Sequence, residues 1–297
     1  METEQKKTLI IHLIIIPLSF TLSGITFLTC FHRQFIWAFF PIGFYFVINT
    51  FLCVYGKRFK EFFTSQILSS LFMICLLFIL YQYYFFLQLH LYIISLVIYH
   101  YGEYFGVLLY HFDNLSFSSY LIDQSDQWLI ATGGSFIELI VENLIFHNIK
   151  NNKILIAIGI LLMIVGHIFR MGGIYTGKKN FTHLIAEQKK KEHELVTKGI
   201  YSLSRHPSYF GFYLWSVGTQ VMCVNPICIV GFTVVLYIFF KRRIISEEFY
   251  LISFFGQSYL EYRNKVPILI PCINLTQTKI QEALSIHEQE KSKLTTP

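Results

Sequence analysis

Long apolar runs, most of them close to twenty residues and nearly free of charge, constrain the fold of this chain more than any other feature. A helix needs about 20 apolar residues to cross the hydrocarbon core of a bilayer, which is about 30 Å thick. The runs are Leu9–Thr29, Phe35–Tyr55, Ile67–Leu87, Leu91–Tyr110, Trp128–Phe146, Ile154–Gly172, Tyr209–Val224 and Ile227–Phe240. They predict an all-α polytopic integral membrane protein with about eight transmembrane helices.

Two parts of this pattern need their own interpretation. The last two runs are short and are separated only by Asn225 and Pro226. Proline starts a helix well but cannot continue one, so we expect a tight helical hairpin that re-enters the membrane. The first run is too long for a signal peptide and lacks a small-residue cleavage site, so we expect it to be a true span.

The composition agrees with membrane insertion and excludes several other classes of protein. Hydrophobic residues make up 54% of the 297 residues and charged residues 14%, whereas a soluble domain carries roughly 25% charged residues. The chain is therefore not disordered, collagen-like or an ordinary cytosolic enzyme. The net charge of +6 comes from basic residues at the ends of apolar runs, which favours a membrane-surface role over nucleic-acid binding.

The cysteines give no sign of a metal site. Six are present, at positions 30, 53, 75, 223, 228 and 272, and most lie inside apolar runs. No pair has the spacing of metal ligands. We expect these residues to be buried, reduced thiols.

The short loops predict the orientation, because Lys and Arg accumulate on the cytosolic side of a membrane protein. One side carries Lys6, Lys7, Lys57, Arg58, Lys60, Arg170, Lys178, Lys179, Lys241, Arg242 and Arg243, and the other carries Arg33, Lys150 and Lys153. This bias predicts that both termini are cytosolic. The loop Asp113–Gln127 is an exception, because it should be cytosolic but contains acidic residues and no Lys or Arg.

Polar side chains are concentrated in the last third of the chain. Residues 173–208 are polar and basic, and Ile244–Pro271 is charged, aromatic and amphipathic in pattern. We therefore divide the chain into six transmembrane helices at 1–172, a polar region with the hairpin at 173–272, and a polar cytosolic tail at 273–297. No internal repeat is visible, which argues against transporter folds built from repeated halves.

A short basic motif precedes the run that starts at Tyr209. Pro207 disfavours helical geometry at His206 and suits the first turn of the helix that follows. Arg205 and His206 are therefore expected at the N-terminus of a membrane-embedded helix, where free N–H groups and the helix dipole favour an anionic ligand group. The alternative is an interfacial anchor, because basic side chains commonly extend to the membrane surface.

A second cluster follows the last apolar run, from Lys241 to Glu248. Arg243 and Glu247 are four residues apart, so they share one face of a helix. An exposed pair of this kind contributes about 0.3–0.5 kcal/mol, and Arg before Glu is the less favourable order. The pair is either an ordinary salt bridge or the cationic and anionic halves of a binding site.

Three acidic residues, Glu103, Glu138 and Glu142, lie inside predicted spans, where a charge is costly. One interpretation is a membrane transporter or scaffold that uses them as a proton or cation path. The other is structural: they are protonated or bonded to neighbouring groups, and they hold the helices together. No string of acidic residues continues into the first three spans or the sixth, which favours the structural interpretation.

Several motifs follow one another between about residue 90 and residue 271. They are Ile98–Tyr104, Glu138, Glu142, His193–Val196, Gly199–Tyr201, Arg205–Gly211, Gly218–Met222, Asn225-Pro226, Glu247-Glu248, Phe254–Gly256, Tyr259, Glu261–Arg263 and Val266-Pro267. The Arg-His-Pro-x-Tyr-x-Gly motif alone is shared with membrane phospholipid methyltransferases and some sterol reductases. Together, these residues resemble the isoprenylcysteine carboxyl methyltransferase family, which the first three spans match only in hydropathy.

The resemblance implies an enzyme of the endoplasmic-reticulum membrane. It would esterify the C-terminal carboxylate of a farnesylated or geranylgeranylated cysteine in CaaX-processed proteins. The methyl donor would be S-adenosyl-L-methionine, bound on the cytosolic side by the region 173–272, with S-adenosyl-L-homocysteine as product and no metal. The implied partners are prenylated CaaX proteins and the lipid bilayer, without nucleic acid.

The resemblance also assigns residues by position. The implied cofactor contacts are His193, Glu194, Leu195, Val196, Tyr201, His206, Pro207, Ser208, Tyr209 and Glu247. The implied substrate contact is Arg243, which with Glu247 forms the implied catalytic pair. The family has a cofactor-contacting Gln seven residues before His193, where this chain has Ala186, so that contact is unassigned.

The chemistry agrees with these residue types. A carboxylate with a pKa of about 3.5 is already ionised at pH 7, so methyl transfer needs no general base. It needs in-line positioning and removal of water from the nucleophile. Arg243 would hold one carboxylate oxygen while the other attacks, and Glu247 would hold a polar or cationic part of the cofactor.

The prenyl chain would supply about 0.8 kcal/mol of binding energy per buried CH₂ in a cleft open to the bilayer. The predicted walls are the spans Leu91–Tyr110 and Trp128–Phe146 and the hairpin. Two alternatives remain at this point. One is a phospholipid N-methyltransferase, whose amine nucleophile must lose a proton, and the other is the transporter or scaffold.

Overall fold

The chain is helical wherever its structure is described. The computed structural model describes residues 4–11, 59–80, 86–123, 125–189, 191 and 193–273, and within these ranges it contains no strand. The predicted span Phe35–Tyr55, most of Leu9–Thr29 and the tail from residue 274 onward lie outside the described residues. The all-α prediction is confirmed for the described part.

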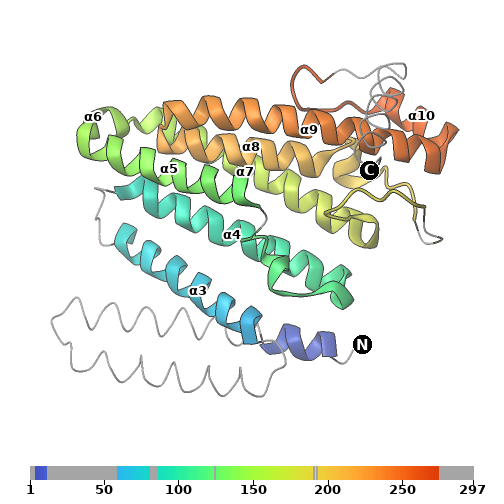
Figure 1. Ribbon diagram of the computed structural model, residues 1–297, viewed down its shortest axis with the longest axis horizontal. Helices are drawn as coiled ribbons and strands as arrows, with labels where there is room; N and C mark the ends of the chain where they lie inside the picture. The colour runs from blue at the N-terminus through green and yellow to red at the C-terminus, as the bar shows by residue number, and fades with distance from the viewer. Residues whose placement is uncertain are drawn as a thin grey trace, which may run out of the picture. The chain divides into compact units, whose positions relative to one another are not determined.

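Within the described residues, the long helices follow the order of the predicted apolar runs. Residues 4–11 are helical. The labelled helices are α3 (Phe59–Leu80), α4 (Leu87–Tyr110), α5 (Asp126–Ile145), α6 (His147–Lys150), α7 (Lys153–Gly177), α8 (Pro207–Cys223), α9 (Pro226–Phe255) and α10 (Gln257–Lys265) (Figure 1). Short 3₁₀ turns are η2 (Phe112–Asn114), η3 (Phe117–Tyr120), η4 (Lys178–Asn180) and η5 (Gly199–Ser202).

The chain is a multi-pass membrane protein. Within the described ranges, four helical stretches are long and apolar enough to cross a membrane: Lys60–Leu80, Leu87–Tyr110, Asp126–Ile145 and Lys153–Asn180. They correspond to the predicted spans that begin at Ile67, Leu91, Trp128 and Ile154. The total of eight spans stays a prediction.

One of these helices starts earlier than its apolar run. The helix α3 begins at Phe59, whereas the predicted span begins at Ile67. The added turns contain four buried polar residues, Glu61, Thr64, Ser65 and Gln66. The Ser65 hydroxyl lies 2.9 Å from the Tyr101 hydroxyl of α4. Hydropathy marks apolar composition and therefore misses buried polar turns.

The chain divides into two compact units, and the first contains α3, α4, α5 and α6. It comprises Met1–Ile156 together with Met222–Asn225. Neighbouring helices in it are antiparallel: Phe78 of α3 stacks on His90 of α4 with 5.1 Å between ring centroids, whereas Ser65 pairs with Tyr101. The Tyr92 hydroxyl lies 3.0 Å from Ser135 Oγ and joins α4 to α5.

A buried lysine organises one end of this first unit. Lys150 Nζ forms an ion pair of 2.6 Å with Glu142 and donates to the carbonyl oxygens of Cys223 and Val224 and to Asn225 Oδ1, at 3.1, 2.9 and 2.7 Å. These three acceptors form the turn between α8 and α9. Asn225 Nδ2 donates in turn to the Ser135 carbonyl. Glu142 is therefore part of a buried structural cluster, which agrees with its structural interpretation.

The second unit contains most of α7 together with α8, α9 and α10. It comprises Ala157–Val221 and the chain from Pro226 onward. The antiparallel helices α7 and α8 approach closely at two glycines, since a Cβ on Gly166 would lie 2.4 Å from the Trp215 nitrogen and one on Gly211 would lie 2.3 Å from the Arg170 nitrogen. Only glycine permits this backbone contact. The predicted boundary at residue 172 falls inside α7.

The helix α8 begins at Pro207, as predicted, and forms an antiparallel hairpin with α9. The ring of Tyr209 stacks on Phe240 at 5.2 Å, and Val224 adopts a positive φ of 55° in the turn. The helix α9 continues past the predicted end at Phe240 to Phe255. The segment Lys241–Glu248 is rich in Lys, Arg and Glu, which are polar but favour a helix, so the helix continues beyond its apolar run.

The cysteines are free but not uniformly buried. Cys75 and Cys223 are buried, Cys228 is partly buried and Cys272 is exposed. The prediction of burial is therefore wrong for Cys272, which follows the last helix in an irregular turn. Cys30 and Cys53 lie outside the described residues.

Candidate functional site

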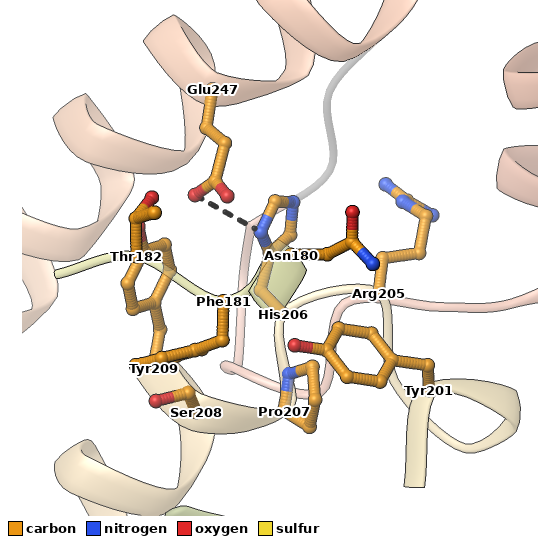
Figure 2. A pocket seen from close by; sticks show the side chains of 10 residues that line it. All are labelled: Asn180, Phe181, Thr182, Tyr201, Arg205, His206, Pro207, Ser208, Tyr209 and Glu247. Atoms are coloured by element: carbon orange, nitrogen blue, oxygen red, sulfur yellow. Dashed lines mark ion pairs between the residues drawn. The ribbon is translucent and has the colours of Figure 1, made fainter. Parts of the chain in front are cut away.

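The polar side chains of the second unit surround two adjoining cavities. The first is lined by Asn180, Phe181, Thr182, Tyr201, Arg205, His206, Pro207, Ser208, Tyr209 and Glu247 (Figure 2). The second is lined by Asn180, Thr182, Ile185, Ala186, His193, Glu194, Glu247, Tyr250, Leu251, Phe254 and Phe255. Asn180, Thr182 and Glu247 line both, so the two cavities together form one elongated site.

The segment before α8 places His206 at the centre of the first cavity. Pro207 opens the helix and leaves His206 outside it. The imidazole lies parallel to the ring of Tyr209, one helical turn on, with 5.6 Å between centroids and an interplanar angle of 3°. Its Nδ1 lies 3.6 Å from Glu247 Oε2 (Figure 2). Its Nε2 lies 2.8 Å from Glu248 Oε1.

Glu248 is the hub of a buried ionic cluster. Its side chain is fully buried. Its Oε1 accepts from Arg205 Nε at 2.9 Å, from His206 Nε2 at 2.8 Å and from the Tyr259 hydroxyl at 2.8 Å, while Arg263 Nε lies 3.1 Å from Oε2. A buried carboxylate needs several donors of this kind to offset the loss of water.

The cluster fixes the ionisation of its members. Burial by itself would lower the pKa of His206, but the adjacent carboxylates of Glu247 and Glu248 outweigh burial and raise it to about 9. Burial would raise the pKa of Glu248, but His206 and Arg205 lower it to about 2. The pKa of Glu247 is lowered as well, because the effects of His206, Tyr209 and Arg243 exceed that of burial. The site therefore contains two carboxylates and an imidazolium at neutral pH.

Glu247 differs from its neighbour because it faces the cavities. Its side chain retains 30% exposure. Its Oε2 is buried but accepts no hydrogen bond from the described residues, since His206 Nδ1 stays at 3.6 Å. A buried carboxylate oxygen in this state can accept a donor from a ligand.

The loop after α7 forms one wall of the second cavity. The Glu194 nitrogen donates to Asn180 Oδ1 at 2.8 Å, and Lys189 Nζ donates to the Phe254 carbonyl at 2.6 Å and lies 4.8 Å from the ring centre of Phe255. These bonds hold the loop against α9. The cavity thus combines polar groups with an aromatic wall, which suits a ligand that carries both charge and a flat apolar group.

Arg243 lies beside this site and is held in place by two acceptors. Its Nε donates to the Tyr209 hydroxyl at 2.8 Å, and its Nη2 donates to the His183 carbonyl. Its guanidinium carbon lies 5.4 Å from the centre of the Tyr209 ring. Arg243 is not among the residues that line either cavity, so its role toward a substrate carboxylate stays a prediction.

Arg205 also has a different setting from the one expected. It lines the first cavity, but Figure 2 shows its guanidinium on the opposite side of the His206 ring from Glu247. The group bonds Glu248 and the carbonyl oxygens of Arg263 and Val266. These contacts fasten the segment after α10, which neither the anion-binding nor the membrane-anchor interpretation anticipated.

The structure brings together most of the residues assigned by resemblance. Tyr201, His206, Pro207, Ser208, Tyr209 and Glu247 line the first cavity, and His193, Glu194 and Glu247 line the second. Leu195 and Val196 line neither, and Leu195 packs against Tyr259 and Tyr262. Ala186, which occupies the position where the family has Gln, lines the second cavity.

Sequence reasoning missed several residues of the site. Asn180 and Thr182 line both cavities, but they follow a predicted span in a stretch without any motif. Glu248 was noted only as the neighbour of Glu247. The pattern Arg-His before the helix and Glu-Glu after the hairpin was the one available signal, because two adjacent cations can pair with two adjacent carboxylates.

The described residues contain no group of three or more His, Cys, Asp or Glu side chains that could hold a metal ion. The expectation of metal-free chemistry stays a prediction.

Comparison with known proteins adds an independent line of evidence. A model of the isoprenylcysteine carboxyl methyltransferase (ICMT) family matches residues 157–253. The protein-S-isoprenylcysteine O-methyltransferase of Dictyostelium discoideum is 45% identical over 184 residues, covering 62% of this chain and 77% of that protein. Protein-S-isoprenylcysteine O-methyltransferase A of Arabidopsis thaliana is 41% identical over 188 residues, covering 63% and 94%.

Two further matches agree. The protein-S-isoprenylcysteine O-methyltransferase of Xenopus laevis is 41% identical over 182 residues, covering 61% of this chain and 63% of that protein, so the chain spans slightly less than two thirds of this relative. The solved structure of the eukaryotic intramembrane Ras methyltransferase ICMT without a monobody aligns with a TM-score of 0.77 and 32% identity, covering 87% of this chain and 96% of that one. These matches confirm the resemblance that the sequence motifs indicate.

Proposed function

Because the chain belongs to the isoprenylcysteine carboxyl methyltransferase family, we propose that it esterifies the C-terminal carboxylate of a prenylated cysteine. The methyl donor is S-adenosylmethionine, and the acceptors are farnesylated or geranylgeranylated proteins after CaaX processing. The single observation that carries the proposal is the pairing of His206 with Glu247 at the junction of the two cavities.

The residues of the two cavities fit this cofactor. When bound, S-adenosylmethionine supplies a methyl group on a positively charged sulfur, which makes that methyl group electrophilic. The buried Oε2 of Glu247, which accepts no hydrogen bond from the described residues, can accept one from a ligand ammonium or hydroxyl. The His206 imidazolium suits a ligand carboxylate, and Phe254 and Phe255 supply the wall for an aromatic ring.

The role of the protein is to position reactants and exclude water. A carboxylate acceptor is ionised at neutral pH and needs no base. Glu247 and His206 fix the donor end of the site, while Tyr209 and Phe181 restrict access of water to the first cavity. Holding two reactants in line in this way contributes about 7–11 kcal/mol to lowering a barrier in favourable cases.

In this proposal, Arg243 orients the carboxylate of the methyl acceptor. It lies on α9 one turn before Glu247, and the bonds to Tyr209 and His183 preset the plane of its guanidinium. A preset planar group binds a carboxylate with less loss of side-chain entropy than a free one does.

The remaining parts of the proposal concern the cell and the organisation of the chain. The enzyme resides in the endoplasmic-reticulum membrane with both termini cytosolic, as the Lys and Arg bias supports. Residues 173–272 form the catalytic region, and residues 1–172 supply the membrane-spanning helices against which the prenyl chain lies. Lipid and prenylated protein are its partners, and nucleic acid is not.

One experiment tests the activity against its alternatives. The detergent-solubilised protein is incubated with methyl-labelled S-adenosylmethionine and either a farnesyl-cysteine analogue or phosphatidylethanolamine. The proposal requires a base-labile methyl ester on the farnesyl-cysteine analogue. Label on phosphatidylethanolamine would indicate a phospholipid N-methyltransferase, and label on neither acceptor would contradict the enzymatic assignment.

A further inference from the structure

We propose that Glu248 is a positioning residue of the cofactor site, which holds the His206 ring in one orientation and keeps it charged. Glu248 is fully buried and does not line either cavity, so it cannot touch a ligand there. Its influence has to pass through His206, which lines the first cavity. This inference rests on the proposed function in one respect, which is that S-adenosylmethionine is the ligand of the site.

The geometry around the imidazole favours a proton on each nitrogen, because a carboxylate lies within 4 Å of both. Glu248 Oε1 lies 2.8 Å from Nε2, and Glu247 Oε2 lies 3.6 Å from Nδ1. Ionised carboxylates only accept hydrogen bonds, and a neutral imidazole has a single N–H. The imidazolium therefore suits both carboxylates: its Nε2–H donates to Glu248, and its Nδ1–H faces the cavity-facing Glu247 as an ion pair without a hydrogen bond.

Glu248 is itself fixed by three groups from two parts of the second unit. Arg205 precedes α8, whereas Tyr259 and Arg263 belong to α10. The carboxylate cannot swing away without breaking these bonds, because each partner lies between 2.8 and 3.1 Å from it. Rigid support of this kind is what a precise site requires from residues that do not touch the ligand.

Other titratable and charged groups also surround His206. Titratable or charged groups around the ring, from every element that packs against it, are Tyr201, Arg205, Tyr209, Arg243, Glu247, Glu248, Tyr259 and Arg263. Only Glu247 and Glu248 favour the protonated ring. Glu247 is partly exposed and 3.6 Å away, so Glu248 at 2.8 Å is the stronger partner.

The consequence is a site that loses ligand affinity in alkali. The pKa of His206 is about 9, well above its ordinary value, because the carboxylates outweigh burial. A raised pKa in the folded state stabilises the protein below the unfolded value of about 6.5, and this contribution is lost as the pH rises through about 9. Both cofactor affinity and thermal stability are therefore expected to fall above about pH 9.

The test compares Glu248→Gln with Arg263→Gln in the full-length protein in detergent. Affinity for S-adenosylhomocysteine is measured by calorimetry from pH 6 to pH 10, and the melting temperature is measured over the same range without ligand. In Glu248→Gln the alkaline loss of affinity should begin at least one pH unit lower, so that binding at pH 8.5 is at least about fourfold weaker than at pH 6.5. The amino group of the ligand titrates identically with every variant, so only differences between variants are interpreted.

Arg263→Gln is the matched control, because it removes a partner of the same buried carboxylate but keeps the carboxylate. This variant should lower the melting temperature. The alkaline limb of its pH profiles, meaning the pH range over which affinity and melting temperature fall, should stay in place or move to higher pH. If Glu248→Gln does not fold, a downward shift of the limb in Arg263→Gln would overturn the proposal by itself. Parallel pH profiles in both variants and the unmodified protein would likewise reduce Glu248 to a structural role.

The two readouts separate this inference from the proposed function. If the unmodified protein binds no S-adenosylhomocysteine, the cofactor assignment fails, while the ligand-free melting profiles still decide on Glu248. A downward shift of the alkaline limb of the melting profile in Glu248→Gln alone would then support the positioning role, and unshifted profiles would refute it.

Discussion

At the scale of single residues, two consecutive glutamates on α9 have different environments. Glu248 is fully buried against Arg205, His206, Tyr259 and Arg263, whereas Glu247 is partly exposed and lines both cavities. Successive residues of a helix point about 100° apart, so one faces inward when the other faces the cavity. This arrangement gives the site one carboxylate for support and one for a ligand.

Arg243 provides the sharpest test at this scale. We expect Arg243→Lys to lose most activity, on the order of 100-fold, because an ammonium cannot reproduce the planar two-donor group and misplaces the nucleophile by about 1 Å. Arg242→Lys is the matched control, since Arg242 is exposed and lines neither cavity. Turnover and S-adenosylhomocysteine affinity are measured for both variants.

The comparison with Arg242→Lys distinguishes a role in orienting the carboxylate from a role as a membrane anchor. Arg243→Lys should still insert, fold and bind the cofactor product, because Arg243 does not line either cavity. If the two variants turn over equally fast, Arg243 is a membrane anchor and the role in orienting the carboxylate is wrong.

The sequence predicts the site residues that belong to motifs. It misses those whose role depends on contacts with residues distant in the sequence. His206, Tyr209 and Glu247 stand in the Arg-His-Pro-x-Tyr-x-Gly and Glu-Glu motifs, and the structure brings them together. Which glutamate faces the cavity depends on the rotation of α9 about its axis. Packing of α9 against α8 and α10 sets that rotation. The contacts involved join residues far apart in the sequence, such as His206 and Glu248, which are 42 positions apart. No local sequence pattern therefore predicts it.

At the scale of helices, the turn between α8 and α9 is fixed by the Lys150 cluster. Lys150 bonds Glu142, the carbonyl oxygens of Cys223 and Val224, and Asn225. Removing one partner of a buried ion pair leaves the other poorly compensated. The cluster therefore couples α5 and α6 to the hairpin turn.

We expect the Glu138→Gln, Glu142→Gln double variant to lose thermal stability before it loses turnover per folded molecule. Most of the loss should come from Glu142, at about 1–3 kcal/mol, because its charge is paired with a buried ammonium. Melting temperature and turnover normalised to folded protein are compared with those of Glu138→Gln alone. A stable double variant without turnover would place these glutamates in the mechanism.

Hydropathy predicts the order of the helices well and their ends less well. It finds α4, α5 and α7 within a few residues, because in these helices the apolar run and the helix nearly coincide. It misses the start of α3 and the end of α9, where buried or surface polar residues continue the helix. The position where a helix leaves the membrane and the position where it ends can differ, and hydropathy indicates only the first.

At the scale of the whole molecule, the candidate site lies in the second unit. Both cavities and the ionic cluster are built from residues between 180 and 263. The sequence predicts this segregation from the change of composition after Gly172. It does not predict that most of α7 packs into the same compact unit as the site, because the glycine contacts of α7 with α8 are invisible in composition.

The segregation predicts that cofactor and prenyl binding can be separated by mutation. We expect His206→Ala to weaken S-adenosylhomocysteine binding by about tenfold or more, since a hydrogen bond to a charged group is removed. Binding of a farnesyl-cysteine analogue without cofactor should change little. Both affinities are measured by titration in detergent, and an unchanged S-adenosylhomocysteine affinity would remove His206 from the site.

The central claim is that the methyl donor binds in the two joined cavities of the second unit. Ultraviolet cross-linking of methyl-labelled S-adenosylmethionine to the full-length protein, followed by peptide mapping, tests this claim most directly. The account predicts label in peptides from residues 180–209 and 247–255, and its suppression by excess S-adenosylhomocysteine. Suppressible label confined to peptides from α3, α4 or α5 would contradict it.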